Sequence, residues 1–292
     1  MFRILRCKVT VIKLIAQIFL KEIIKKTSFL VVFACFVPKK EVFLYFCGCI
    51  MYKITAIVLR AFAFNDSKLM VDVLSREEGR VSCVALVGSS KKRKSRRQLF
   101  RPMSLLELVV ERKSAGSLLV VKDAHIFRAF SSIPFDPYKL SISMFVAEFL
   151  CRVTMGGSES PLLYDYVCDS VQWLDGSSAG FSNFHLVFMM RLTRFVGVYP
   201  NMEGYVEGYC FDMQNGCFVS SAFPGRGFLD AEDSRIMYLL MRMDYGSMHL
   251  FKMSHEERNR CLDVVLDFYR LHVPDFGELK SLQVLRDMFG TI

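Results

Sequence analysis

The chain has 292 residues, of which 52% are apolar and 13% are aromatic, which is enough to give two ordinary domains a buried core each and excludes an intrinsically disordered chain. The formal charge of +9 is unevenly spread: residues 51–130 hold 16 Lys and Arg against 7 Asp and Glu, whereas residues 131–292 hold 13 against 20. We therefore expect an anionic partner to bind within residues 51–130.

Residues 1–50 are apolar and basic, which raises the question of a membrane segment. Their longest uncharged stretch, Thr27 to Pro38, is shorter than the roughly 20 residues of a spanning helix. Charges recur too often in this segment for a signal peptide. Two interpretations remain, an interfacial amphipathic segment or a start codon placed too far upstream. We favour the second, because Met51 directly precedes a well-formed strand, and we expect residues 1–50 to lie outside both domains.

Residues 51–130 show the alternation of apolar residues that is typical of β-strands. Five such segments are separated by turn sequences: YKITAIVLRAF (52–62), SKLMVDVLS (67–75), RVSCVALVG (80–88), PMSLLELVVERK (102–113) and SLLVVKDAHIFRAF (117–130). Five strands in about eighty residues are typical of a small barrel, and the five-stranded OB-fold is the commonest solution. We therefore predict an OB-fold barrel for residues 51–130.

The sequence LVGSSKKRKSRRQLF (86–100) connects the third and fourth strands and places six Lys or Arg among the seven positions from Lys91 to Arg97. A charge run is usually a solvated loop. This run, however, holds most of the excess positive charge of its domain, and OB barrels bind single strands across grooves bordered by such loops. We expect these residues to neutralise phosphates without recognising sequence. Four aromatic residues could also stack on bases, although we expect them in the core: Phe62, Phe64, Phe127 and Phe130.

The sequence SSIPFDP (131–137) contains two prolines and marks the domain boundary, beyond which the apolar period becomes that of helices. Six helical segments are expected, with a less regular piece at 198–229: residues 138–154, 161–175, 181–197, 231–243, 254–273 and 277–289. Gly197 is placed to end the third segment, and Ser254 and Glu257 have the spacing of a capping box. We predict an α+β chain whose second domain, residues 131–292, is a helical bundle.

The chemical motifs of the sequence favour a binding protein over an enzyme. Cys210 and Cys217 could suggest a metal, but a structural zinc site normally needs four ligands, and no second cysteine pair or nearby His is present. The sequence GSSAG (176–180) matches G-x-S-x-G but follows a predicted helix instead of a strand. There is no Walker A, G-x-G-x-x-G or H-E-x-x-H motif, and the ten cysteines lie mostly in apolar runs, as expected of reduced core residues. We predict no catalysis, no metal and no cofactor.

The segments NDSKLMVDVLSREEGRVSCVALVGSSKKRKS and LFRPMSLLEL resemble the N-terminal OB domain of the bacterial recombination mediator family RecO, with its D-S, E-x-G-R and S-K-K elements in order. The segments SIPFDPYKLSISMFVAEFL and NFHLVFMMRLTRFVGVYP are similar to helices of the family's C-terminal domain. The resemblance covers Met51 to about Gly290 and no part of residues 1–50.

This resemblance implies a cytoplasmic, nucleoid-associated protein, without membrane attachment, that acts in DNA repair. RecO proteins bind single- and double-stranded DNA, anneal complementary strands and, with RecR, help RecA to replace single-strand DNA-binding protein (SSB) on gapped DNA. Carried over to this chain, the DNA-binding residues are Arg80, Ser90, Lys91, Lys92, Arg93, Lys94, Arg96 and Arg97. Ser89 stands where the family often has Arg. Some members carry a four-cysteine zinc finger of which this chain keeps two cysteines, so we predict no zinc.

The family also binds the acidic, Phe-ending tail of SSB through its helical domain. An apolar groove with a basic rim would hold the buried Phe and its carboxylate. Arg191 and Arg194 are candidates for that rim, and the alternative is that they are ordinary solvent-facing arginines of an amphipathic helix. Two other function classes remain open: an adaptor that uses residues 1–50 as an amphipathic anchor, and an enzyme whose site is assembled from scattered residues.

Overall fold

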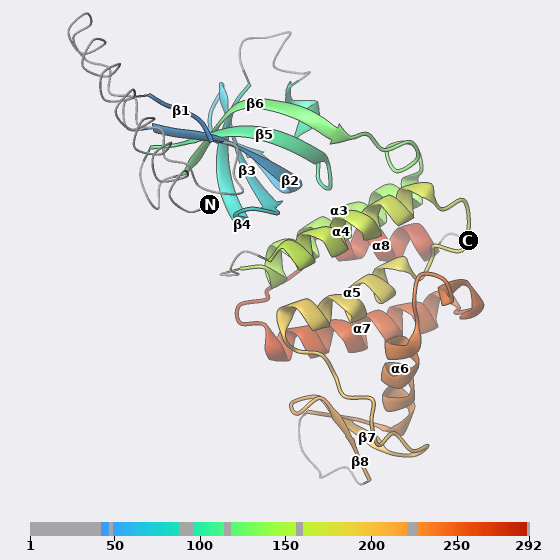
Figure 1. Ribbon diagram of the computed structural model, residues 1–292. Helices are drawn as coiled ribbons and strands as arrows, with labels where there is room; N and C mark the ends of the chain where they lie inside the picture. Colours follow the sequence, from blue (N-terminus) through green and yellow to red (C-terminus); the bar gives the residue numbers. More distant parts are fainter. Residues whose placement is uncertain are drawn as a thin grey trace, which may run out of the picture.

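A β-barrel lies beside a helical domain in the computed structural model of this chain (Figure 1). The structure describes six stretches of the sequence, residues 42–46, 49–87, 96–113, 118–155, 160–220 and 227–290. The chain is therefore α+β, as predicted.

The barrel is built from antiparallel hairpins that close on themselves. Its strands are β2 (Cys49–Ala63), β3 (Lys68–Ser75), β4 (Gly79–Leu86), β5 (Leu105–Arg112) and β6 (Leu119–Arg128). Neighbours follow the order β2-β3-β4-β6-β5, β4 and β6 run parallel, and β5 pairs back onto β2. This is the five-stranded OB topology that the sequence predicts. A further strand, β1 (Val42–Phe46), pairs with β2 and lies in the segment expected outside the domains.

A β-bulge in β2 divides its side chains between two cores. Before the bulge, Val58 points into the barrel and is fully buried there. The register then shifts between Val58 and Arg60, so two residues of β2 face one of β3. As a result Leu59 and Arg60 both lie on the outer side of the barrel, and Ala61 returns to the inner side. Every later residue of β2 has the opposite orientation from the one that simple alternation predicts.

The helical domain contains α3 (Pro137–Val153), α4 (Pro161–Gly176), α5 (Phe184–Val196), α6 (Ala231–Arg242), α7 (His255–His272) and α8 (Ser281–Gly290). The predicted ends are confirmed where a capping residue defines them. Gly197 closes α5 with a φ of +78°, which a residue without Cβ adopts without strain. Ser254 and Glu257 form the predicted capping box of α7.

A small three-stranded sheet occupies the piece that we expected to be irregular. Its strands are β7 (Cys210–Asp212), β8 (Cys217–Val219) and β9 (Phe228–Leu229). Cys210 pairs with Val219 and Cys217 pairs with Asp212, so the two cysteines lie on opposite strands of one hairpin. The sheet lies at the far end of the helical domain from the barrel (Figure 1).

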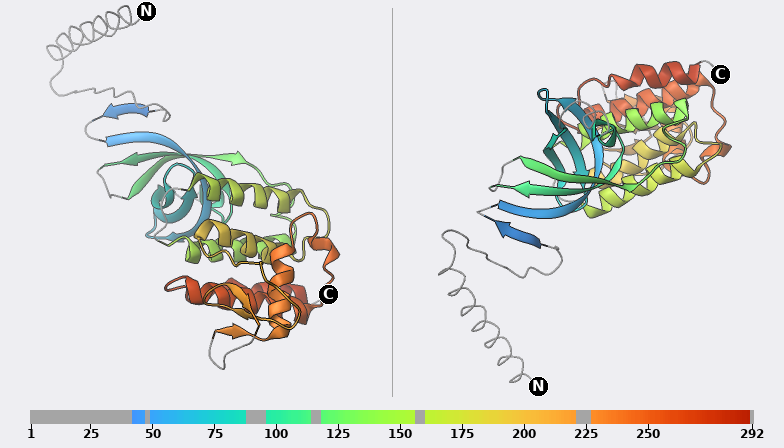
Figure 2. Two further views of the ribbon diagram at one scale, coloured as in Figure 1. Left: turned by 60° about the horizontal axis from the view of Figure 1, so that its bottom comes forward. Right: turned by 90° about the horizontal axis from the view of Figure 1, so that it is seen from above.

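The barrel and the helical domain share one apolar core along their junction. Five residues from the outer side of the barrel belong to the core cluster of the helices: Ile57, Leu59, Leu74, Met103 and Leu105. The barrel lies against α3 and α4, with the remaining helices behind them (Figure 2). The two domains are therefore held together by packing and not only by the connecting chain.

The connection between the domains is fixed by one carboxylate. Asp175, at the end of α4, accepts hydrogen bonds from the backbone amides of Ser131, Ser132 and Ile133 at 2.8–2.9 Å. Partial burial alone would raise the pKa of Asp175, but these amides outweigh it and lower the pKa to about 2.

Candidate nucleic-acid interface

The two ends of the basic run are fixed beside the β2–β3 hairpin. The predicted contact residues Ser90, Lys91, Lys92, Arg93 and Lys94 lie outside the described residues. Before the run, the amide of Val87 donates to the carbonyl of Ser67 at 2.9 Å. Near the end of the run, the guanidinium of Arg96 donates to the carbonyl of Leu86 at 2.9 Å. Arg96 and Arg97 stand on a single helical turn, residues 96–99.

Arg80 lies at the other end of β4 from these residues. Its Nη1 donates to the carbonyl of Cys151 on α3 at 2.7 Å, and its Nη2 is 3.6 Å from a carboxylate oxygen of Asp72. Only 16% of its side chain is exposed. Arg80 is six residues from Leu86 along β4, or about 20 Å at the usual rise of a strand. The structure thus places Arg80 in the junction with the helices and does not bring it together with Arg96 and Arg97.

A charged row crosses the outer face of the barrel next to this junction. Asp72 is almost fully buried and accepts hydrogen bonds from Arg60 Nε and Ser82 Oγ, both at 2.5 Å. Burial raises the pKa of Asp72, but the bonds from Ser82 and Arg60, with the charges of Arg60 and Arg80, bring it below its ordinary value. The row is electrically satisfied and binds the three strands to one another.

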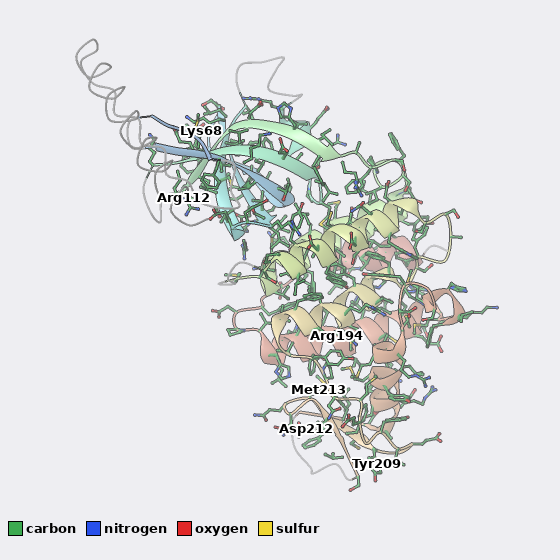
Figure 3. The ribbon with its side chains drawn as sticks, in the orientation of Figure 1. Lys68, Arg112, Arg194, Tyr209, Asp212 and Met213 are labelled. Carbon is green, nitrogen blue, oxygen red and sulfur yellow. The ribbon has the colours of Figure 1, made fainter. Side chains whose placement is uncertain are left out.

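Two further rows of side chains cross the same face beyond Arg60, here called the distal rows. They are Phe62, Met70 and Val84, and then Phe64, Lys68 and Leu86. Lys68 lies on the barrel in Figure 3. Phe62 is 47% exposed and Phe64 is 61% exposed.

Our expectation that these two aromatic residues lie in the core was therefore wrong. Phe62 and Phe64 have the same parity along the strand as Ile54 and Val58, which point inward. The bulge at Leu59 reverses that parity, so both rings point outward. No signal in the sequence marks this bulge, and the pairing register is needed to find it.

The end of β6 is also exposed. Phe127, expected in the core, is 50% exposed, whereas Phe130 is partly buried against the helical core. A hydrogen bond from the Ala124 amide, and more weakly the charges of His125 and Arg96, hold the pKa of Asp123 below its ordinary value. Arg96 is therefore close enough to Asp123, in the middle of β6, to act on its charge.

A cavity of about 530 Å³ opens between the barrel and the helices. Its walls are mostly apolar, with Leu59 from β2 and Met144 from α3, and Arg60 and Arg80 reach it from the charged row. Glu148 lies in the cavity, where it accepts bonds from the amides at the start of α8, so its carboxylate is already occupied. The cavity belongs to the domain junction.

Arg191 and Arg194 both stand on α5 in the helical domain (Figure 3 labels Arg194). Arg191 is 3.7 Å from a carboxylate oxygen of Asp244 and lies over the ring of Tyr245. Arg194 donates to the hydroxyl of Tyr199 at 2.8 Å and lies 4.5 Å from its ring centroid. The side chain of Arg191 is 41% exposed, although its Nε is buried, and Arg194 is exposed; the cavity above includes neither residue.

Within the described part of the chain, no group of three or more His, Cys, Asp or Glu is arranged to hold a metal ion. Cys210 and Cys217 are free thiols on adjacent strands. Of the helices that the structure describes, none is long and apolar enough to cross a membrane.

Comparison with known sequences identifies both domains. The family model described as "Recombination protein O N terminal" matches residues 50–130, and the model described as "Recombination protein O C terminal" matches residues 134–283. These two ranges coincide with the barrel and with most of the helical domain.

Similar proteins come from several bacteria and share the same name. "DNA repair protein RecO" of Phocaeicola vulgatus is 46% identical over 240 residues, which are 82% of this chain and 100% of the relative. The proteins of that name from Bacteroides fragilis and Porphyromonas gingivalis are 41% and 36% identical, over 82% and 80% of this chain and 99% and 97% of the relatives. The chain belongs to the RecO family of DNA repair proteins.

Proposed function

We propose that this protein is a non-catalytic recombination mediator that binds single- and double-stranded DNA through its barrel. The proposal rests on membership of a DNA repair family and on the position of the basic run. Four Lys or Arg lie between two chain positions, Val87 and Arg96, that are both fixed at one edge of the barrel, and Arg96 with Arg97 completes the six. A phosphate backbone placed there would meet most of the excess positive charge of the domain.

The dependence of DNA affinity on salt tests this proposal. All six basic residues from Lys91 to Arg97 are changed to Ala. If they contact four to six phosphates of a single strand, the slope of log K against log salt becomes shallower by roughly 3 to 4. A charge control replaces four exposed basic residues of the helical domain: Arg235, Arg242, Lys252 and Arg270. An unchanged slope in the six-residue variant, or an equal change in the control, contradicts the proposal.

We further propose that the helical domain contacts partner proteins, while the barrel holds DNA. The helical domain, residues 131–292, carries a net negative charge, which disfavours DNA binding there. The proposed partners are RecR, with which the protein would help RecA to load, and the tail of SSB. This role would be exercised in the cytoplasm of the bacterial cell, where the DNA lies. Strand annealing and RecA loading onto SSB-coated DNA, each measured with and without RecR, test it.

For the SSB tail we propose Arg191 and Arg194 as carboxylate contacts, because each has a partly exposed side chain beside an aromatic ring. The experiment titrates the protein with a labelled acidic peptide that ends in Phe. The R191A/R194A variant is expected to bind it about tenfold more weakly. The matched control changes Arg235 and Arg242, two exposed arginines of α6. Equal binding by both double variants would locate the tail elsewhere.

A further inference from the structure

The distal rows form an exposed apolar surface on the outer face of β2, β3 and β4. Phe62, Phe64 and Leu86 are each more than two-fifths exposed, and Met70 and Val84 between them are half-buried. They adjoin one another across three strands, so they form one contiguous patch. Contiguous exposed apolar groups on a folded domain usually mark a binding surface.

Cations adjoin this patch. Lys68 belongs to the second row, and the guanidinium of Arg60, which is also paired with Asp72, lies 5.6 Å from the ring centroid of Phe62. Arg96 is bonded to the carbonyl of Leu86, where the basic run ends. A ligand that suits this arrangement presents flat apolar groups together with a regular series of negative charges. Single-stranded DNA has both, because its base faces and its phosphates are accessible together.

The spacing of the two rings favours an unpaired strand. Phe62 lies in β2 and Phe64 directly follows its last residue, Ala63, so the two are about 7 Å apart at the rise of an extended chain. In B-form DNA successive nucleotides of one strand rise by about 3.4 Å. Bases stacked one on each ring must therefore be drawn apart to about twice that spacing, which base pairing opposes.

We propose that Phe62 and Phe64 form a base-stacking platform that gives the barrel a preference for single-stranded over duplex DNA. This proposal rests on the DNA-binding function proposed above and adds to it the residues that recognise bases. The basic run supplies charge that both forms of DNA share, and the two rings supply a contact that only exposed bases can make.

The test compares a fluorescein-labelled oligothymidylate with a duplex of the same length in anisotropy titrations. Phe62→Leu and Phe64→Leu remove each ring and keep an apolar side chain, and Phe64→Tyr keeps the ring. We expect each Leu variant to bind the single strand about 5- to 100-fold more weakly, the range for loss of one stacked base. Duplex affinity should change less than about twofold, and the salt slope should stay the same, because no charge is removed. Phe64→Tyr should bind the single strand as tightly as the unaltered protein, because it keeps the ring.

The matched control is Phe135→Leu, since Phe135 is 83% exposed but lies on the connection to the helical domain. It should leave both affinities unchanged. Equal losses for single strand and duplex, or none for either, would overturn the stacking proposal. So would unchanged DNA binding accompanied by loss of RecR in a pull-down, which would make the patch a protein interface.

Photo-crosslinking gives a direct second measurement. An oligothymidylate that carries 5-iodouracil crosslinks to aromatic rings that stack on the modified base. Mapping of the crosslinked peptide to residues 61–68 supports the platform, and mapping only to other peptides contradicts it. If the unaltered protein binds no single strand at all, the proposed DNA-binding function fails. If it binds with the expected salt slope and the Leu variants behave like the unaltered protein, only the stacking proposal fails.

Discussion

The outer face of β2, β3 and β4 has two ends. They differ in whether their side chains contact other parts of the protein or face solvent. At the junction end, Leu74 is buried among the helices, and Asp72 bonds Arg60 and Ser82. At the distal end, Phe64 and Leu86 face solvent. The strands and their pairing are continuous between the two ends.

This difference separates stability from binding on one sheet. Groups at the junction end are already paired with the protein, so their replacement changes the free energy of unfolding. Groups at the distal end gain little from folding, so their replacement should change ligand affinity instead. The following predictions test that separation, from the largest expected effect to the smallest.

Leu74→Ala should have the largest effect on stability. Leu74 is 2% exposed and belongs to the core shared by the barrel and the helices. Its truncation should lower the free energy of unfolding by about 3 kcal/mol, from lost burial and the cavity left behind. Urea denaturation measures this loss. DNA affinity per folded molecule should not change. A selective loss of DNA binding in a stable Leu74→Ala protein would contradict the separation of stability from binding.

Asp72→Asn should lower the free energy of unfolding by about 2 kcal/mol. The substitution removes the negative charge between Arg60 and Arg80, and Arg80 is too buried to be solvated instead. We place the effect below the range for fully buried pairs because Arg60 is more than half exposed. The control is Asp123→Asn, whose ion pair with His125 is exposed on both sides and should contribute less than about 0.5 kcal/mol. Similar losses in both variants would contradict the prediction.

Asp175→Ala should lower stability by about 1 to 2 kcal/mol, because three backbone amides of the interdomain connection lose their acceptor. Asp165→Ala serves as a control, since Asp165 forms an exposed ion pair with Arg76. That control should stay within about 0.5 kcal/mol of the unaltered protein. Limited proteolysis between the domains should also become faster in Asp175→Ala alone.

Acid should weaken the same connection. The pKa of Asp175 is lowered to about 2 in the folded protein, below its ordinary value of 3.8. A lowered folded pKa contributes stability that is present above the unfolded value and is lost as pH falls toward 2. After allowance for solvent screening, Asp175 should account for about 1 kcal/mol of the loss between pH 5 and pH 2. Asp175→Asn should flatten the stability curve over this interval, and an equally steep curve would show that other carboxyl groups cause the acid loss.

The strands, the helices and their capping residues were predictable from the sequence because each depends on local pattern. Alternation located the five barrel strands, and Ser254 with Glu257 located the start of α7. The basic run was equally visible, since charge density needs no knowledge of the fold.

The exposed aromatic residues were not predictable, because their orientation depends on pairing. The alternation that places Val58 inward also predicts an inward Phe62, and only the register with β3 shows the extra residue at Leu59. The position of Arg80 was hidden for a similar reason: its neighbour Cys151 is 71 residues away in sequence. Contacts between distant segments are not encoded in any local period.

Leu86→Ala should have the smallest effect and is the most direct test of the distal end. Leu86 occupies a β-strand on the same outer face as Leu74, but it is 44% exposed. Its truncation should change the free energy of unfolding by less than about 0.5 kcal/mol. It should weaken single-strand binding about two- to threefold, because the apolar surface beside Phe64 shrinks by three carbon atoms. Since its carbonyl still accepts from Arg96, the end of the basic run stays in place. A loss of stability as large as that of Leu74→Ala would show that both ends of the face are structural.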